Sequence, residues 1–303
     1  MSVKTVQAII NGQMHTLTYN TGTSKWEATV TAPNKSSYNQ ANHYYPVTIK
    51  ATDDAGNVTT VTDTDITLGE DLRLTVKEKV KPVITITSPT ASANLTNNKP
   101  KIAFKVTDDD SGVNADTIKI TIDSGAAITS GITKTKVDGG YTCTYTPKTS
   151  LADGSHTIKV NVSDNDGNAA DQKSVTFKID TVPPTLSVTS PADNLITNDT
   201  SVTVRGTTND ATSSPVTVKI KLNSGAAEAV TVNSDGSFEK ALTLTAGTNT
   251  ITVTATDGAG KTTTVNRTVK VDKGAPIIRE VTLTPNPIDA GKTYIISVDA
   301  IDE

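Results

Sequence analysis

The residues of this chain whose types could do chemistry are clustered carboxylates, three histidines and one cysteine. The densest run of carboxylates is Asp108, Asp109 and Asp110, which follows a strand-like segment. Calcium prefers sites rich in carboxylate oxygens, so these three aspartates are the calcium candidates of the chain. Aspartate also accepts hydrogen bonds from the backbone of its own turn. The sequence therefore favours solvated turns, with no bound metal, over a calcium site.

The histidines and the cysteine do not form a catalytic pattern. His15, His43 and His156 occupy unrelated places, and none has an acid or nucleophile at the spacing of a triad or zinc site. Cys143 lies in an alternating strand, which predicts a small buried thiol, and as the single cysteine it cannot form a disulfide within the chain. We therefore expect no enzyme, no catalytic residue and no cofactor.

Aromatic side chains are the remaining candidates for ligand contact, because they can stack on sugars. The segment 32–43 is longer than the corresponding loops later in the chain, and loops carry function more often than the scaffold does. The candidate glycan surface comprises three tyrosines in and beside that loop: Tyr38, Tyr44 and Tyr45. Trp26 opens an alternating strand, as Tyr141 and Phe238 do, and is therefore predicted to be a core residue.

The elements that position these residues are predicted to be β-strands. The chain has 303 residues, enough for two to three domains, and is 35% hydrophobic but only 4% aromatic. Threonine and valine, which suit a pleated and half-buried surface, are abundant. The 13 prolines and 19 glycines punctuate short alternating segments. This composition predicts an all-β protein without large aromatic cores.

Charge and hydropathy exclude two classes of partner. The 28 basic and 32 acidic residues form no basic run, so nucleic-acid binding is not expected. No stretch approaches 18 apolar residues, and no apolar leader follows Met1, so we expect no membrane insertion and no signal peptide in this chain. An extracellular, virion-surface or cell-surface location without an export signal would fit a trimmed segment or a product released by lysis.

Internal repeats organise the sequence. Three segments open with a proline at the start of a strand: Pro82, Pro184 and Pro276. Three alternating strands end in an Asp-x-x-Gly turn, whose aspartates are Asp53, Asp164 and Asp257. The repeat length is about 90–100 residues, the size of one two-sheet sandwich. We predict complete domains at 81–182 and 183–275, an incomplete domain at 1–80 and a two-strand segment at 276–303.

The incomplete domain and the final segment complement each other. Residues 1–80 lack the first two strands of a repeat, and residues 276–303 contain only those two, with Val298 expected at the position of Val106. Each half would leave apolar side chains without a partner. The predicted assembly interface consists of Val281, Leu283, Tyr294, Ile296, Val298, Val6, Ala8 and Ile10.

Three arrangements could cover these faces. The final segment could insert into the first domain of the next molecule, which would give a head-to-tail filament or a ring. It could return to the first domain of its own chain, which would need a bent array. The sequence could also be a slice of a longer array, cut out of register.

The prolines at the three repeat openings, the Ser-Pro pairs and the Asp-x-x-Gly hairpins resemble those of tandem bacterial Ig-like domains on Gram-positive surface proteins and phage or prophage tail-associated proteins. The resemblance covers the whole chain and implies a fold of tandem Ig-like β-sandwiches. It implies a non-enzymatic spacer or decoration module, which would associate with itself or with other structural proteins. The alternative function is a carbohydrate-binding adhesin that recognises a surface glycan through loops of the first domain.

Overall fold

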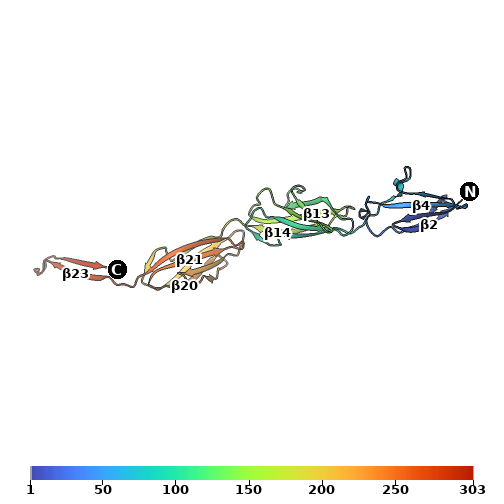
Figure 1. Ribbon diagram of the computed structural model, residues 1–303. Helices are drawn as coiled ribbons and strands as arrows, with labels where there is room; N and C mark the ends of the chain where they lie inside the picture. The colour runs from blue at the N-terminus through green and yellow to red at the C-terminus, as the bar shows by residue number, and fades with distance from the viewer. Residues whose placement is uncertain (1, 303) are drawn as a thin grey trace. The chain divides into compact units, whose positions relative to one another are not determined.

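The computed structural model describes residues 2–302, and its regular secondary structure is almost wholly β-strand (Figure 1). The chain divides into two compact units, Met1–Ile179 and Asp180–Glu303. The first unit contains the first and second repeats, and the other contains the third repeat and the final segment. The predicted all-β class and the tandem Ig-like fold are confirmed.

The second repeat is a complete sandwich. Its strands are β7 (Val83–Ser88), β8 (Asn94–Leu95), β9 (Ile102–Thr107), β10 (Val113–Ile122), β11 (Thr133–Val137), β12 (Gly140–Tyr145), β13 (Gly154–Asp164) and β14 (Lys173–Ile179). One sheet has the order β10-β13-β14-β8 and the other β11-β12-β9-β7. Side chains from both sheets, such as Phe104 and Phe177, are fully buried in one core between them. Alternation of apolar and polar residues along each strand produces this arrangement.

The third repeat is built in the same way. Its strands are β15 (Thr185–Ser190), β16 (Leu195–Thr197), β17 (Ser201–Asn209), β18 (Thr217–Leu222), β19 (Glu228–Val230), β20 (Ser237–Thr243), β21 (Gly247–Thr256) and β22 (Thr262–Val271). The sheets are β15-β17-β20 and β16-β22-β21-β18-β19. Phe238 is buried opposite Gly206, where an added Cβ would lie 2.5 Å from the phenyl ring. The aromatic side chain therefore needs glycine on the facing strand.

The first repeat contains a single sheet among its described residues. Its elements are β1 (Val3–Ile10), β2 (Gln13–Asn20), β3 (Lys25–Glu27), the 3-10 helix η1 (Ser37–Asn39), β4 (Tyr45–Asp53), β5 (Val58–Val61), the 3-10 helix η2 (Glu70–Leu72) and β6 (Arg73–Leu74). The sheet order is β3-β2-β1-β4-β5, with β6 paired to β4. Asn11 and Gly12, both with positive φ, form the tight turn between β1 and β2 that the sequence predicts.

Strand β3 differs from its counterparts in the other repeats. β12 pairs with β9, and β20 pairs with β17, in the sheet opposite the Asp-x-x-Gly hairpin. β3 instead pairs with β2, where Trp26 lies opposite Tyr19 and is only half-buried. Within residues 2–80 no strand corresponds to β9 or β17. The partner that β3 has in a complete repeat is therefore not supplied by the first repeat.

The final segment forms a hairpin of β23 (Ile277–Thr284) and β24 (Ile295–Ile301). Val281 pairs with Val298 and Leu283 with Ile296, so these four side chains share one face. The opposite face carries the polar pairs Thr282–Ser297 and Glu280–Asp299. The apolar residues of the hairpin are exposed. The hairpin is thus amphipathic, and its apolar face is uncovered in this chain.

Strand pairing corrects the predicted register of this hairpin by two residues. Two positions after the opening proline, Ile84 pairs with Val106, Leu186 with Thr208 and Ile278 with Ala300. Ala300, and not Val298, therefore corresponds to Val106. The error arose because Val298 was matched to Val106 by residue type, whereas the distance from the opening proline, 24 positions from 82 to 106, 184 to 208 and 276 to 300, gives Ala300.

Candidate functional site

Three carboxylates meet at the start of the second repeat. Glu78 lies in the segment before β7, Asp108 follows β9, and Asp164 ends β13. One oxygen from each side chain lies within 4.8 Å of the other two. Asp108 and Asp164 are buried and Glu78 is half-buried. Residues that are far apart in the sequence thus form one shielded acidic cluster.

The hydrogen bonds of this cluster leave one oxygen without a partner. Asp108 Oδ1 accepts from the backbone N–H groups of Asp110 and Gly112, at 3.1 and 2.8 Å. Asp164 accepts from the backbone and side-chain nitrogens of Asn168, both at 2.8 Å. Asp108 Oδ2 is buried without a hydrogen-bond partner. Burial, together with the neighbouring Asp164 carboxylate, raises the pKa of Glu78 above its ordinary value.

The third repeat carries an equivalent cluster. Asp180 precedes β15, Asp210 follows β17 and Asp257 follows β21, and their oxygens again lie within 4.8 Å of one another. All three residues are buried. Asp210 Oδ1 accepts from Thr212 and Ser213 N–H, at 2.8 and 2.6 Å. Asp180 Oδ2 and Asp257 Oδ2 have no hydrogen-bond partner.

The predicted calcium candidates do not act together. Asp108 joins the cluster, but Asp109 is exposed. Asp110 Oδ1 instead accepts from Ser36 N–H, at 3.0 Å, and from the side-chain amide of Asn39. Sequence reasoning missed Glu78 and Asp180, although each lies four residues before a repeat-opening proline. That shared offset is the signal that could have identified them.

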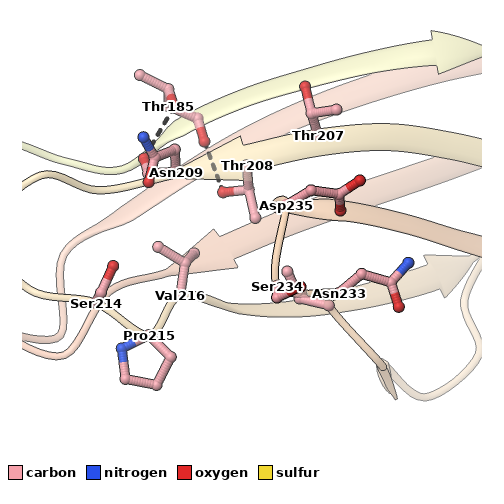
Figure 2. A pocket seen from close by; sticks show the side chains of 12 residues that line it. Thr185, Thr207, Thr208, Asn209, Ser214, Pro215, Val216, Asn233, Ser234 and Asp235 are labelled. Carbon is pink, nitrogen blue, oxygen red and sulfur yellow. Dashed lines mark hydrogen bonds between the residues drawn. The ribbon is translucent and has the colours of Figure 1, made fainter.

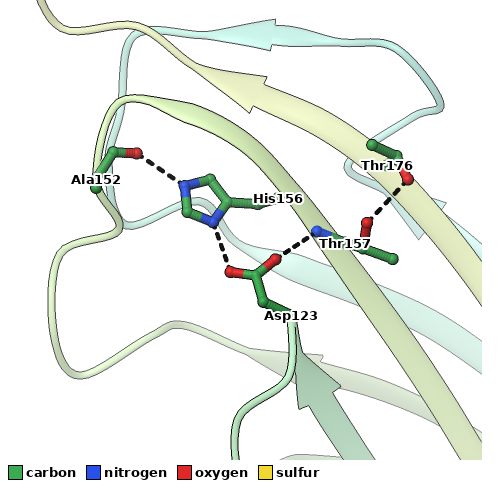
Figure 3. A network of polar contacts seen from close by, with 5 residues as sticks. All are labelled: Asp123, Ala152, His156, Thr157 and Thr176. Atoms are coloured by element: carbon green, nitrogen blue, oxygen red, sulfur yellow. Dashed lines mark hydrogen bonds and ion pairs between the residues drawn. The ribbon is translucent and has the colours of Figure 1, made fainter.

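His156 has an acidic partner that its sequence position did not reveal. Its Nδ1 lies 2.8 Å from Asp123 Oδ2, and its Nε2 lies 2.8 Å from the Ala152 carbonyl oxygen; both contacts are drawn in Figure 3. Asp123 Oδ1 also accepts from Thr157 N–H at 2.8 Å. Burial disfavours the imidazolium, but the hydrogen bonds to Ala152 and Asp123 outweigh it and raise the pKa of His156. Since both ring nitrogens are engaged within the fold, this pair fastens a loop and activates no nucleophile.

Cys143 lies in the core of the second repeat. Its side chain is fully buried, as its place in the alternating strand predicts. Burial raises the pKa of the thiol to about 11. The reactive thiolate is therefore disfavoured at neutral pH.

The three candidate tyrosines do not form one aromatic surface. Tyr45 is buried, and its hydroxyl donates to the Lys35 carbonyl oxygen at 3.1 Å. The Tyr44 hydroxyl donates to Asp63 at 2.8 Å, while Tyr38 is exposed and has its ring 4.6 Å from that of His43. The assignment of Tyr45 to a glycan surface is wrong, because the start of β4 turns it inward.

A wide surface hollow of about 790 Å³ lies on the third repeat (Figure 2). Thr185, Thr207 and Thr208 line it together with short polar loop residues. Its single carboxylate, Asp235, already accepts from Ser237 N–H at 2.9 Å. None of the residues that line the hollow is aromatic or basic. It therefore offers weak hydrogen-bonding groups without a platform for stacking.

The predicted assembly residues fall into two groups. The five in the final hairpin, from Val281 to Val298, are all exposed. In the first repeat, Val6 and Ala8 are buried and Ile10 is half-buried. Val6 and Ala8 therefore do not lie on an open face, because the first repeat already covers that part of its sheet. The uncovered surfaces are therefore the hairpin and the edge at β3.

Comparisons with known proteins identify the modules. A family model described as a bacterial Ig-like domain matches residues 80–181, and one described as glucodextranase domain B matches residues 184–273. The PI-type proteinase of Lactococcus lactis subsp. cremoris is 32% identical over 157 residues, which are 46% of this chain and 8% of the proteinase. Chitinase ChiA of Flavobacterium johnsoniae is 28% identical over 215 residues, which are 63% of this chain and 12% of the chitinase.

Comparison with solved structures finds two sets of tandem domains. Domains A168–A170 of titin cover 88% of this chain and 86% of their own, with a TM-score of 0.42 and 12% identity. The fibronectin(III)-like modules of Clostridium thermocellum CbhA cover 62% of this chain and 94% of their own, with a TM-score of 0.37 and 18% identity. Among residues 2–302, no helix has the length and apolar character to cross a membrane. The chain is a tandem array of Ig-like domains, and its second repeat matches the bacterial Ig-like family.

Proposed function

We propose that this chain is a non-catalytic, extracellular structural module that spaces or decorates a bacterial surface or a phage particle. The matched segments are small parts of the proteinase and the chitinase, which suits accessory modules rather than reactive domains. The second and third repeats each enclose their own core, so they can act as independent spacers. The short segments before Pro82 and Pro184 favour semi-rigid spacing.

We further propose that the module assembles head to tail, with the final hairpin docking on the first repeat of a second copy. The observation that carries this proposal is the hairpin's uncovered apolar face, centred on the pairs Val281–Val298 and Leu283–Ile296. An isolated two-stranded hairpin is at best marginally stable in water. Burying each of these side chains contributes about 1.5–3 kcal/mol before ordering costs.

The occupant is inferred from the pairing of the complete repeats. β23 and β24 pair antiparallel as β7–β9 and β15–β17 do, and each pair has one bulge in its first strand, near the end of β7 and β15 but near the start of β23. In those repeats the second strand also pairs with β12 or β20. β3 is the counterpart of β12 and β20, and it lacks that partner. A second copy would therefore add β24 along β3, by strand addition.

Light scattering of the whole chain over a range of concentrations tests the assembly. We expect the mass to rise with concentration, and Ile296→Lys on the apolar face to abolish the rise. Ser297→Lys is the matched control, because Ser297 lies next to Ile296 but on the polar face. A concentration-independent monomer would overturn the assembly, as would equal effects of the two substitutions.

A further inference from the structure

We propose that the clusters Glu78–Asp108–Asp164 and Asp180–Asp210–Asp257 are two calcium sites of the same design. Each takes one carboxylate from the segment before a repeat and two from the strand ends of that repeat. The inference does not depend on head-to-tail assembly, because each cluster lies within one compact unit of the chain.

The electrostatics of each cluster call for a cation. Three carboxylates this close repel one another, and low exposure weakens the screening by water. Within residues 2–302, none of the six takes part in an ion pair with Lys, Arg or His. A bound divalent ion would remove this repulsion.

Unpartnered oxygens provide an independent sign of a ligand. Asp108 Oδ2, Asp180 Oδ2 and Asp257 Oδ2 are buried without a hydrogen bond, although their residues are more than nine-tenths buried. Buried carboxylate oxygens are rarely left without a partner, because desolvation is then uncompensated. A buried carboxylate oxygen without a hydrogen bond occurs in both clusters, so it is not a local feature of packing in one repeat.

Backbone hydrogen bonds occupy the other oxygen of two of these carboxylates. Asp257 Oδ1 accepts from Ala259 and Lys261 N–H, at 2.8 and 2.9 Å, and Asp108 Oδ1 is held by two N–H groups in the same manner. Each Oδ1 is therefore engaged in its own turn, and Oδ2 remains for a ligand. In Asp257 the Asp-x-x-Gly turn uses Oδ1 and leaves Oδ2 for an ion, so the two roles are compatible in one side chain.

The donor set favours calcium over other ions. All six ligands are carboxylate oxygens, whereas zinc prefers nitrogen and sulfur. Two oxygens bound to one calcium at about 2.3–2.6 Å lie at most about 5 Å apart, which the 4.8 Å spacing satisfies. Calcium accepts six to eight ligands, so water and carbonyl oxygens can complete the shell, whereas magnesium demands tighter octahedral geometry. An ion here would fasten the segment before β7 or β15 to its repeat.

Calorimetric titration of the EGTA-treated whole chain with calcium tests the sites. We expect two calcium ions per chain, one fewer in Asp108→Asn and one fewer in Asp257→Asn, with a lower thermal midpoint in chelator. Asparagine keeps the oxygen that the turn requires, and circular dichroism checks the fold. Asp109→Asn and Asp235→Asn are matched controls that should bind two ions.

Three results would overturn the proposal. The first is that calcium releases no heat on titration and does not change the melting temperature of the EGTA-treated chain. The second is that the control variants lose as many bound calcium ions as Asp108→Asn and Asp257→Asn do. The third is that magnesium gives the same heat and the same change in melting temperature as calcium. If Asp108→Asn fails to fold, Glu78→Gln replaces it, since Glu78 is half-buried and lies outside the strands. That variant should also bind one ion fewer.

Discussion

The first and second repeats share an antiparallel strand pair but differ in how their apolar residues are covered. β1 and β4 of the first repeat pair as β10 and β13 do in the second. In the second repeat an opposing sheet buries Phe104, Ile120 and Ile158 completely. In the first repeat, the buried apolar side chains among the described residues are Val6, Ala8 and Tyr45. The strand pattern thus specifies a sheet, but a large core also requires a second sheet.

A shared position shows how the repeats diverge within this common frame. Counting back eight residues from the aspartate of each Asp-x-x-Gly turn gives Tyr45, His156 and Asn249. All three are buried, and each hydrogen-bonds to a carbonyl oxygen of the loop before its strand: Lys35, Ala152 and Thr245, respectively. The residue at this position holds the preceding loop by a hydrogen bond in all three repeats, although its side chain differs from repeat to repeat.

The largest expected loss of stability comes from truncating a buried residue, and truncating its exposed counterpart in the final hairpin should cost little. Phe104 and Val298 occupy equivalent positions in β9 and β24, but only Phe104 is buried. Phe104→Ala should lower the stability of the second repeat by about 3–5 kcal/mol. Val298→Ala in dilute protein should change stability by less than about 0.5 kcal/mol. Urea unfolding followed by circular dichroism measures both, and comparable losses would show that the hairpin is covered in solution.

An intermediate effect is expected at His156, because its partner is charged. His156→Gln should cost roughly 1–2 kcal/mol near neutral pH. The folded pKa of His156 is raised above 6.5, so its contribution is complete below that pH and is lost as the pH rises through the folded value. Burial opposes ionisation of Asp123, but its hydrogen bonds lower the pKa below 3.8, so its contribution is lost only as the pH falls through that lower value.

The measurement is the thermal midpoint of the second repeat across this pH range. His156→Gln should flatten the decline above pH 6.5 without altering the third repeat, where Asn223 and Asn249 occupy the equivalent places. The same decline in the variant would exclude His156 as its source.

The smallest effect is expected at Tyr45 in the first repeat. Tyr45→Phe removes the hydroxyl that donates to Lys35 and should cost about 1 kcal/mol. Trp26, the single tryptophan, lies in the same repeat and reports its unfolding by fluorescence. Tyr38→Phe is the control, because Tyr38 lies in the same repeat and is exposed. An unchanged midpoint in Tyr45→Phe would show that the hydroxyl bond is not needed.

Local signals in the sequence were sufficient to predict where the strands and turns of the repeats lie. Prolines at strand starts, Asn11-Gly12 and the Asp-x-x-Gly turns each have a backbone requirement that is readable residue by residue. The candidate sites depend on distant pairings instead. Asp123 contacts His156, which is 33 positions away in the sequence, and Glu78 lies close to Asp164, which is 86 positions away (164 − 78). Such encounters follow from register and bulges, which alternation of residue types leaves undetermined.

The shared loop fastener at Tyr45, His156 and Asn249 also has a mechanical consequence. A string of modules under tension yields first at its weakest member, and of these three residues His156 is the one imidazole, whose pKa is raised above its ordinary value of 6.5. Mild alkalinity would therefore weaken the middle module while sparing its neighbours. The order in which the modules extend would then depend on the acidity of the surroundings as well as on the applied force.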